Sequence, residues 1–251
     1  MRLDIERLRR LRPQNQLHYF ETIGSTMTEA ARLAGTGAPH GTAVFAEEQT
    51  AGIGRLGRSW QSDAELGIYC SILLRLQVDP STLPVINLVL GLATAEAIQK
   101  ATRLACDLRW PNDVLIHERK VAGILAQLVD HCVIAGIGIN VNQMSFPPDL
   151  RTPATSLRME CAGEIQSRED IVIKLIESVD TFSSMLMTQG SECIVRAFTL
   201  ASSYALDRRV LMEEDGRRGV TAGLDEDGFL LVRFDNGDME RIAAGGVRRD
   251  A

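Results

Sequence analysis

The sequence predicts a mixed α/β (α+β) fold, a mixed β-sheet with flanking helices, followed by a small C-terminal β barrel. Between residues 17 and 201, strand-like apolar segments are interleaved with segments of helical apolar spacing. After residue 202 only short strand-like segments remain, separated by Glu-Asp-Gly and Asn-Gly turns, which is typical of a small all-β unit. The 251 residues suffice for one large domain with a small appendage. We expect domains at residues 1–201 and 202–251.

Alternating or continuous apolar residues predict six strands in the large domain, at residues 17–22, 42–47, 67–76, 108–116, 120–128 and 133–140. The strand at 67–76 is expected to be central in the sheet. A tight turn at residues 117–119 is expected to join the two strands on either side of it.

Four helices are predicted, at residues 27–34, 84–101, 169–188 and 191–201. The segment 84–101 has apolar residues at helical spacing, among them Val85, Leu88 and Leu92, and is expected to be the long core helix. Ser25 or Thr26 is suited to cap the first of these helices.

The C-terminal unit is expected to contain four short strands, at residues 208–213, 219–224, 229–234 and 239–243. Gly-containing turns between them match hairpin connections. We place the domain boundary near Ser202.

Composition argues against several classes of function. The net charge is −6, from 27 basic and 33 acidic residues, so no global electrostatic footprint for nucleic acid exists. The basic run at residues 7–12 fits a solvated helix face better than a nucleic-acid-binding arm. The longest apolar segment, 83–98, is interrupted by polar residues and too short for a bilayer.

The N-terminus and the cysteines indicate a cytoplasmic protein. The first twelve residues are charged and contain no apolar h-region, so we expect no secretory signal. Five scattered cysteines without a CxxC pair fit reduced thiols better than disulfides or zinc. The four histidines are dispersed as well, so a metal held by protein alone is not expected.

The most informative segment is residues 49–60, which contain three glycines and two arginines, Arg55 and Arg58. Glycine lets the backbone approach a ligand closely, and guanidinium groups supply charge and forked donors. Exposed N–H groups beside guanidinium suit a phosphate or a carboxylate. Taken alone, the segment is also compatible with a flexible polar surface loop.

Two further motifs change that balance. Residues 109–114 read Arg-Trp-Pro-Asn-Asp-Val, and a turn brings Lys120 back on the next strand. The Lys120 ammonium is therefore expected to converge with Asp113 and the arginine loop. A third segment, 136–142, places glycines in a strand, where they allow close ligand approach. Each alone also fits a hairpin with a surface salt bridge or a glycine-weakened core strand.

In this order and spacing, the motifs resemble the biotin protein ligases that lack an N-terminal DNA-binding domain. The resemblance extends from Leu17 to Val247. It is carried by Gly24-Ser-Thr, Glu48-Gln-Thr-Ala-Gly-x-Gly-Arg-x-Gly-Arg-x-Trp60, Trp110-Pro-Asn-Asp113, Lys120-x-x-Gly-Ile124 and Gly138-Ile-Asn-Val-Asn142. It implies that the C-terminal unit is an SH3-like barrel.

The resemblance also implies a reaction. Such ligases join the carboxylate of biotin to the α-phosphate of ATP and then transfer the biotinyl group to a lysine of a biotin carboxyl carrier protein. Two anions must meet in the first step, which requires fixed cations. By resemblance, Lys120 and Arg55 are the catalytic cations.

Further roles follow from the matched positions. The biotin-binding set is Ser25, Thr26, Gln49, Gly52, Ile53, Gly54, Arg55, Lys120, Gly123 and Gly138, with Gly136 along the tail. The ATP-binding set is Arg55, Arg58, Asn112, Asp113, Lys120 and Asn140. Mg²⁺ is expected with the ATP phosphates, with Asp113 as a possible ligand. The alternative for Ser25 and Thr26 is an N-cap alone, and Trp110 is expected to be core.

Two mobile or docking parts are also expected. The loop 49–58 is expected to order over the adenylate and exclude water, and the loop 141–155, with Phe146, to close over adenosine. The carrier domain is expected to add a strand to an exposed sheet edge. The chain itself is expected to be a monomer or homodimer without nucleic-acid or membrane partners.

The sequence departs from the family pattern at Ile53, where arginine is usual, and at Met27, where asparagine is commoner. Ile53 removes one cation near the reacting groups. Two alternatives stay open: a lipoate–protein ligase and, from another class, a non-catalytic biotin-binding regulatory module. A biotin-responsive repressor is disfavoured because residues 1–16 are too short for a helix-turn-helix.

Overall fold

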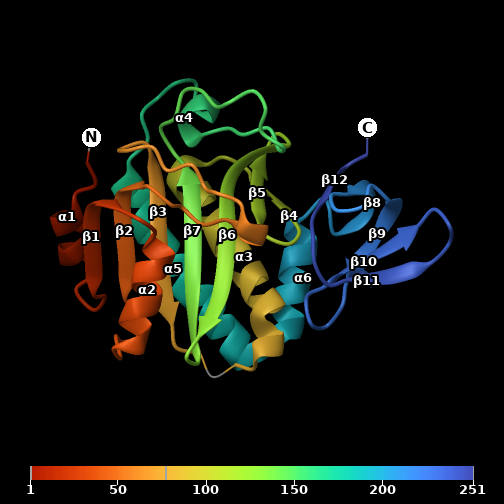
Figure 1. The fold of residues 1–251 in the computed structure, drawn as a ribbon, viewed down its shortest axis with the longest axis horizontal. Helices are drawn as coiled ribbons and strands as arrows, with labels where there is room; N and C mark the ends of the chain where they lie inside the picture. Colours follow the sequence, from red (N-terminus) through yellow and green to blue (C-terminus); the bar gives the residue numbers. More distant parts are fainter. Residues whose placement is uncertain (1, 77, 251) are drawn as a thin grey trace.

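The computed structural model describes residues 2–76 and 78–250, which form two β-sheets with helices packed on the larger one (Figure 1). The larger sheet has seven strands in the order β1-β2-β3-β7-β6-β5-β4. The smaller sheet has five strands in the order β11-β10-β9-β8-β12. The predicted mixed α/β class is confirmed.

The large sheet is mixed, because β1 and β2 are parallel and its other neighbouring pairs are antiparallel. Helix α2 (Thr26–Gly35) provides the crossover that a parallel pair requires. The strands are β1 Leu17–Ile23, β2 Ala43–Gln49, β3 Gly67–Leu74, β4 Asp107–Arg109, β5 Asp113–Ile116, β6 Arg119–Val129 and β7 Cys132–Asn140.

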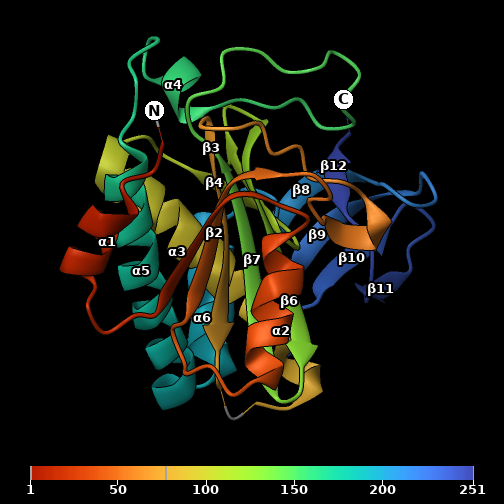
Figure 2. The same ribbon diagram turned by 60° about the vertical axis from the view of Figure 1, so that its left-hand side comes forward.

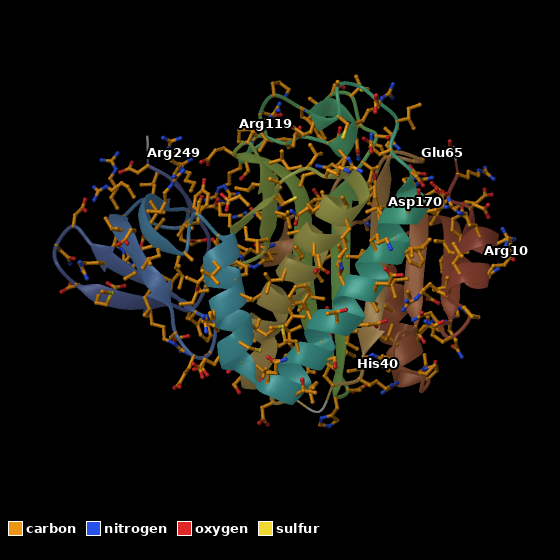
Figure 3. All side chains as sticks on the ribbon, turned by 180° about the vertical axis from the view of Figure 1, so that it is seen from behind. Arg10, His40, Glu65, Arg119, Asp170 and Arg249 are labelled. Atoms are coloured by element: carbon orange, nitrogen blue, oxygen red, sulfur yellow. The ribbon has the colours of Figure 1, made fainter. Side chains whose placement is uncertain are left out.

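Helices cover both faces of this sheet. Helix α2 lies on one face, and α3 (Leu83–Thr102), α5 (Arg168–Gln189) and α6 (Ser191–Ala201) lie on the other (Figures 2 and 3). Because strand side chains alternate, neighbouring residues of one strand enter different clusters. Val44 joins the small cluster under α2, whereas Phe45 joins the large core on the opposite face.

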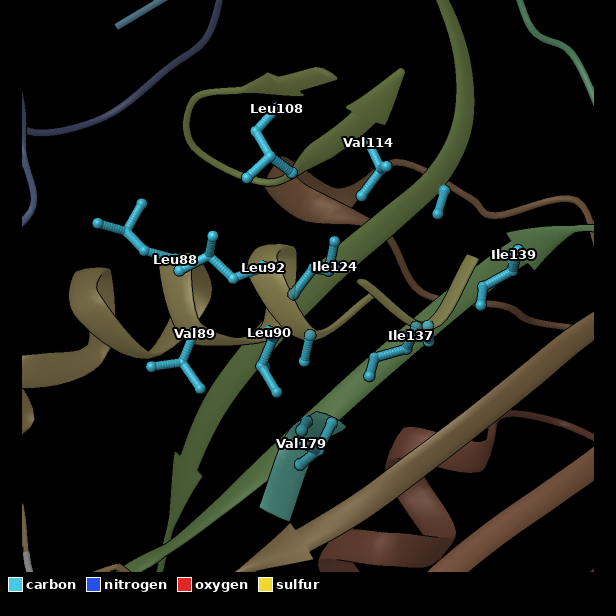
Figure 4. Close-up of a cluster of buried hydrophobic side chains, with 14 of the residues drawn as sticks. Leu88, Val89, Leu90, Leu92, Leu108, Val114, Ile124, Ile137, Ile139 and Val179 are labelled. Atoms are coloured by element: carbon cyan, nitrogen blue, oxygen red, sulfur yellow. The ribbon is translucent and has the colours of Figure 1, made fainter. Parts of the chain in front are cut away.

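The predicted core helix is α3, whose apolar residues are buried along its length. Leu88, Val89 and Leu92 pack with strand residues such as Ile124 and Ile137 (Figure 4). The apolar segment was expected to be too short for a bilayer, which is wrong, because the helical stretch Pro80–Thr102 is long and apolar enough to cross one. However, 61% of its apolar window is buried inside the protein. The helix therefore belongs to the core between the sheet and α5.

The remaining short elements are α1 (Ile5–Leu11), α4 (Leu157–Glu160) and the 3₁₀ turns η1 (Arg55–Gly57) and η2 (Pro80–Thr82). Helix α1 carries the basic run, with Leu8 buried and the arginines toward the surface. Its start is fixed because Glu47 accepts the main-chain N–H of Leu3 and Glu169 that of Asp4.

The prediction of one continuous strand at 108–116 is wrong. The segment is a hairpin in which β4 pairs with β5, with Arg109 opposite Asp113. The turn between them contains the cis Trp110–Pro111 bond. Proline has no N–H to donate to a strand ladder, so the chain turns there instead of continuing. Asn112 therefore lies in the turn of this hairpin, and Asp113 follows it as the first residue of β5.

The C-terminal strands are confirmed, and β12 is an addition. They are β8 Leu206–Met212, β9 Arg218–Leu224, β10 Leu230–Phe234, β11 Met239–Ile242 and β12 Val247–Arg249. Within the described residues the outer strands β11 and β12 do not pair with one another, so the expected barrel is an antiparallel sheet here. Register shifts in two of its strand pairs bend the sheet locally.

The small sheet is joined to the large one through shared packing. Val210, Leu230 and Val232 belong to the same hydrophobic cluster as helix α3. Trp110 is core, as expected, and its indole N–H donates to the main-chain oxygen of Gly228 at 3.0 Å. Helix α6 ends at Ala201 and β8 begins at Leu206, while the domain boundary near Ser202 stays a prediction.

Candidate active site

The glycine-arginine loop folds back on itself between β2 and β3. The N–H of Gly54 donates to the main-chain oxygen of Arg58 at 2.7 Å, and that of Trp60 to Gly52 at 2.9 Å. Ile53 and Ser59 form an isolated bridge. A Cβ on Gly52 would lie 2.4 Å from the main-chain oxygen of Trp60, so this fold of the loop requires glycine there.

The loop places Trp60 against the glycines of β6 and β7. A Cβ added to Gly138 would lie 2.4 Å from the Trp60 ring, and one added to Gly123 2.7 Å from it. The Lys120 ammonium is 5.2 Å from the centre of the same ring, within cation–π range. Trp60 belongs to the sequence motif, and in the structure its ring covers the two glycines and lies beside the Lys120 ammonium.

Asp113 lies between two cations. Its Oδ1 is 2.6 Å from the Lys120 Nζ, and its Oδ2 accepts a hydrogen bond from Arg109. Burial raises the pKa of Asp113, but the attraction of Lys120 and Arg109 outweighs it, so that its pKa is lowered. Asp113 therefore stays a carboxylate and fixes the Lys120 ammonium. This confirms the expected convergence of Lys120 and Asp113.

Arg55 is held beside Asp113 and Lys120 by a hydrogen bond to Asn112, the residue before Asp113. Its Nη1 donates to the side-chain oxygen of Asn112 at 3.1 Å and to the main-chain oxygen of Gly245 at 3.0 Å. Asn112 in turn donates to the main-chain oxygen of Ile124 at 2.9 Å. Burial lowers the pKa of Arg55, yet a guanidinium keeps its charge at neutral pH.

Two cavities meet at these residues. The larger, about 220 Å³, lies between the arginine loop, the β4–β5 hairpin, the loop 141–155 and the small sheet. The smaller, about 50 Å³, lies between α2, the loop and the glycines of β6 and β7. Both are lined by the same five residues, Gly54, Arg55, Trp60, Asn112 and Lys120. Two ligands, one in each cavity, would therefore meet beside the Arg55 guanidinium and the Lys120 ammonium.

The inner end of the smaller cavity is polar. The Gln49 side-chain oxygen accepts the main-chain N–H and the hydroxyl of Thr26, at 2.8 and 3.0 Å, and its amide donates to Ser62 at 2.8 Å. Ser25 and Gly52, both expected to bind biotin, do not line either cavity. Ser25 occupies the N-cap position of α2, but its buried hydroxyl makes no capping bond and has no partner among the described residues. Capping therefore does not account for Ser25.

The two departures from the family pattern both line this cavity. Met27 is buried, and its sulfur lies where a Cβ on Gly136 would come within 2.4 Å. Ile53 is 43% exposed at the cavity mouth. Neither side chain can supply charge or a strong hydrogen bond there.

The structure brings all six ATP-side residues expected from the sequence to the larger cavity. Asn112, Asp113, Lys120 and Asn140 all line the larger cavity. Asn140 donates to the main-chain oxygen of Thr155 at 3.1 Å, which fixes the end of the loop 141–155. Arg55 and Arg58 of the arginine loop line the cavity as well, Arg58 from an exposed position. Phe146 of the loop 141–155 is a further lining residue.

Sequence reasoning missed several lining residues. Arg109 is buried, forms an ion pair with Asp113 and donates a hydrogen bond to the Thr152 hydroxyl. Arg151, Glu213 and the segment Gly245–Val247 also line the larger cavity. They come from loops and from the small sheet, where no local sequence pattern marks them; only the Gly-Gly pair at 245–246 was a signal.

Asp113 is the side chain that the sequence offers as a Mg²⁺ ligand. In residues 2–76 and 78–250, no group of three or more His, Cys, Asp or Glu side chains has metal-binding geometry. Each oxygen of Asp113 already faces a cation. Asp113 is therefore a poor fit as a Mg²⁺ ligand.

Comparison with known proteins places these features in a family. Residues 19–142 match the family model described as the biotin/lipoate A/B protein ligase family. The chain is 34% identical over 232 residues to the bifunctional ligase/repressor BirA of Bacillus subtilis, covering 88% of this chain and 70% of that protein. It is 30% identical to the biotin–[acetyl-CoA-carboxylase] ligase of Mycobacterium tuberculosis, covering 92% and 88%.

The fold agrees with the sequence relatives. The structure is similar to that of a biotin protein ligase from Aquifex aeolicus in complex with biotin and ATP, with a TM-score of 0.80 and 32% identity. The match covers 94% of this chain and 99% of that one. Both sheets thus have counterparts in a solved structure.

Proposed function

The chain belongs to the biotin/lipoate A/B protein ligase family, and we propose that it is an ATP-dependent biotin protein ligase. In this proposal it activates biotin as biotinyl-5′-AMP and transfers the biotinyl group to a lysine of a biotin carboxyl carrier protein. The observation that carries it is the meeting of two cavities at Lys120 and Arg55. Biotin would occupy the smaller cavity and ATP the larger one.

In the first step, a carboxylate oxygen of biotin attacks the α-phosphorus of ATP, and the bond to pyrophosphate breaks. Both reactants are anions, and negative charge grows on the phosphoryl oxygens. Lys120 and Arg55 are held in advance by Asp113 and Asn112. Fixed cations in a partly buried site lower the cost of this encounter without reorganising during the reaction.

The polar end of the smaller cavity would hold the ureido ring. Thr26 and Gln49 line this end and are linked to one another by hydrogen bonds. Ser25 precedes Thr26 in the chain, and its buried hydroxyl has no partner in the part of the chain that the structure describes. A few fixed polar groups in an otherwise apolar slot give orientation. Trp60 lies over Gly123 and Gly138, and Met27 lies over Gly136, so these two side chains would form the apolar wall of the slot.

The larger cavity would hold ATP with its phosphates toward Arg55 and Arg58. Phe146 and the loop 141–155 would cover the adenosine. Asn112 and Asn140 would contribute to this side, and Asp113 would act by holding Lys120. Mg²⁺ would arrive bound to the phosphates of ATP, and the proposal includes no step on a protein-bound metal.

In the second step, the neutral amine of the carrier lysine attacks the carbonyl carbon of the mixed anhydride. The bond to AMP breaks, an amide forms and the amine loses its proton. No side chain of this chain has to be a nucleophile. The anhydride reacts with water, so the loop 49–58 is proposed to cover it until the carrier arrives.

The proposal is tested with purified chain, biotin, MgATP and a biotin carboxyl carrier domain, whose mass is measured afterwards. We expect a gain of one biotinyl group. Lys120→Ala should keep the fold and lower the rate at least about a hundredfold, as loss of a fixed charge-stabilising group does. Lys174→Ala removes an exposed lysine of α5 and should retain full activity.

The outcomes separate the alternatives. Pyrophosphate exchange driven by lipoate rather than biotin would identify a lipoate–protein ligase. Biotin binding without formation of an AMP ester would identify a non-catalytic binding module. A carrier that stays unlabelled by the wild-type chain, or a Lys120→Ala variant with wild-type activity, would overturn the proposed mechanism.

A further inference from the structure

Glu213 is a carboxylate in the wall of the larger cavity, directly after β8. Its side chain is only 8% exposed. Its main-chain N–H donates to the oxygen of Gly246 at 2.9 Å, beside the pairing of Met212 with Val247. The backbone of Glu213 is therefore held by two strands, and its carboxylate is presented to the cavity from a rigid element.

Two arginines from other segments face this carboxylate. The Arg58 Nη1 is 3.6 Å from Glu213 Oε2, and the Arg151 Nε is 3.7 Å from the same oxygen. These are ion-pair distances, longer than an N–H···O hydrogen bond. Arg151 also donates from Nη2 to the main-chain oxygen of Glu213. Both arginine side chains are nearly half exposed, so they are free to exchange partners.

The three segments approach one another only in the folded chain. Arg58 comes from the glycine loop, Arg151 from the loop 141–155 and Glu213 from the small sheet. All three line the cavity that also contains Arg55 and Lys120. The carboxylate thus occupies a place where two guanidinium groups converge at the edge of a site rich in cations.

We propose that Glu213 is an exchangeable counter-ion that pairs with Arg58 and Arg151 until the triphosphate of the nucleotide replaces it. This rests on the proposed function, because the larger cavity must bind ATP. A phosphate chain and a carboxylate compete for the same two guanidinium groups, which bind both kinds of anion. Glu213 therefore sets how tightly the triphosphate binds and adds Arg151 to the phosphate-binding arginines.

If Glu213 competes with the triphosphate, removing its charge should increase the affinity for ATP, whereas loss of a purely structural residue should not. Glu213→Gln keeps the shape but removes the competing charge. ATP should then bind about tenfold more tightly, because a like charge near the phosphates is gone. Adenosine, which has no phosphates, should bind with unchanged affinity. Arg151→Gln should weaken ATP binding about tenfold and leave adenosine binding unchanged.

The experiment measures the dissociation constants of ATP, adenosine and biotin by calorimetry for the full chain and its variants. Glu240→Gln is the matched control, since this carboxylate pairs with Arg217 on the outer surface of the small sheet. It should leave all three constants unchanged. Thermal unfolding of each variant checks that it is folded.

The outcomes separate this inference from the proposed function. Wild-type chain that binds ATP, with Glu213→Gln binding it equally or more weakly, overturns the inference alone. Unchanged ATP affinity in Arg151→Gln does the same. Wild-type chain that binds neither ATP nor biotin overturns the proposed function and the inference with it.

Discussion

At the scale of single residues, the candidate site is defined by how its cations are held. Lys120 is fixed by Asp113 at 2.6 Å and Arg55 by Asn112 at 3.1 Å. Asp113 and Asn112 are neighbours at the turn of the β4–β5 hairpin. The Trp-Pro-Asn-Asp motif thus orients two cations. Its Asn and Asp would be needed for activity even without contact to the reacting atoms.

Ile53 is the position where a cation can be added. Its side chain is 43% exposed and lines the smaller cavity beside Arg55. Ile53→Arg should slow the release of biotinyl-AMP severalfold, because a further positive charge attracts the phosphate. The measurement is a trapping assay of the intermediate. Ile53→Gln controls for side-chain length and polarity, and unchanged or faster release from Ile53→Arg contradicts the prediction.

Asp113 gives a prediction about pH. Its folded-state pKa is lowered, so its contribution to stability is present above its unfolded pKa, about 4, and is lost as pH falls through the folded pKa. Asp113→Asn leaves Lys120 and Arg109 without their counter-charge and should cost about 3–5 kcal/mol at pH 7. Urea unfolding measures both proteins between pH 7 and 3.

The difference in unfolding free energy between wild type and Asp113→Asn should shrink below about pH 4, because the wild-type carboxyl is then protonated in the unfolded chain. A difference that is constant over this range is incompatible with a charged Asp113. A difference near zero at pH 7 is equally so.

At the scale of elements, the site depends on glycines in paired strands. Gly123 of β6 lies opposite Gly138 of β7, and the Trp60 ring lies over both. The sequence predicted close approach to these strands, and the structure identifies an indole as the group that approaches. The sequence predicted β4 and β5 as one strand, because apolar residues lie on both sides of Pro111.

Gly138→Ala tests this packing. The new Cβ would lie 2.4 Å from Trp60 Cε2, so the ring must move away, and such overpacking costs about 1–3 kcal/mol. We expect the dissociation constant for biotin to rise about tenfold or more. Gly35→Ala is the control, because its Cβ would meet only Asp130 Oδ2 at 3.9 Å. Equal biotin affinity in the two variants argues against Trp60 as a wall of the slot.

At the scale of the whole molecule, the larger cavity is assembled by both sheets. Arg55 bonds to Gly245 and Trp110 to Gly228, each across the junction between the large and the small sheet. The shared hydrophobic cluster makes the two sheets pack as neighbours in one core. The small sheet therefore contributes directly to the wall of the proposed nucleotide site.

The two tryptophans allow this junction to be tested. Trp110→Phe removes the donor to Gly228 and leaves a buried carbonyl without its partner, which should cost about 1–3 kcal/mol. Trp60→Phe removes an indole N–H that has no partner in the described structure. Its loss should therefore be smaller. Urea unfolding measures both, and equal losses contradict a specific role for the Trp110 bond.

The sequence by itself determined the fold class, the core helix, most strands and the motifs that contain Lys120, Arg55 and Gln49. These follow from residue type and short spacing, which act along the chain. The tertiary structure alone decided that Arg109, Arg151 and Glu213 line the same cavity. It also decided that Ser25 is buried without a capping bond. Such contacts join segments far apart in the sequence, and only packing of the whole chain brings their charges within range.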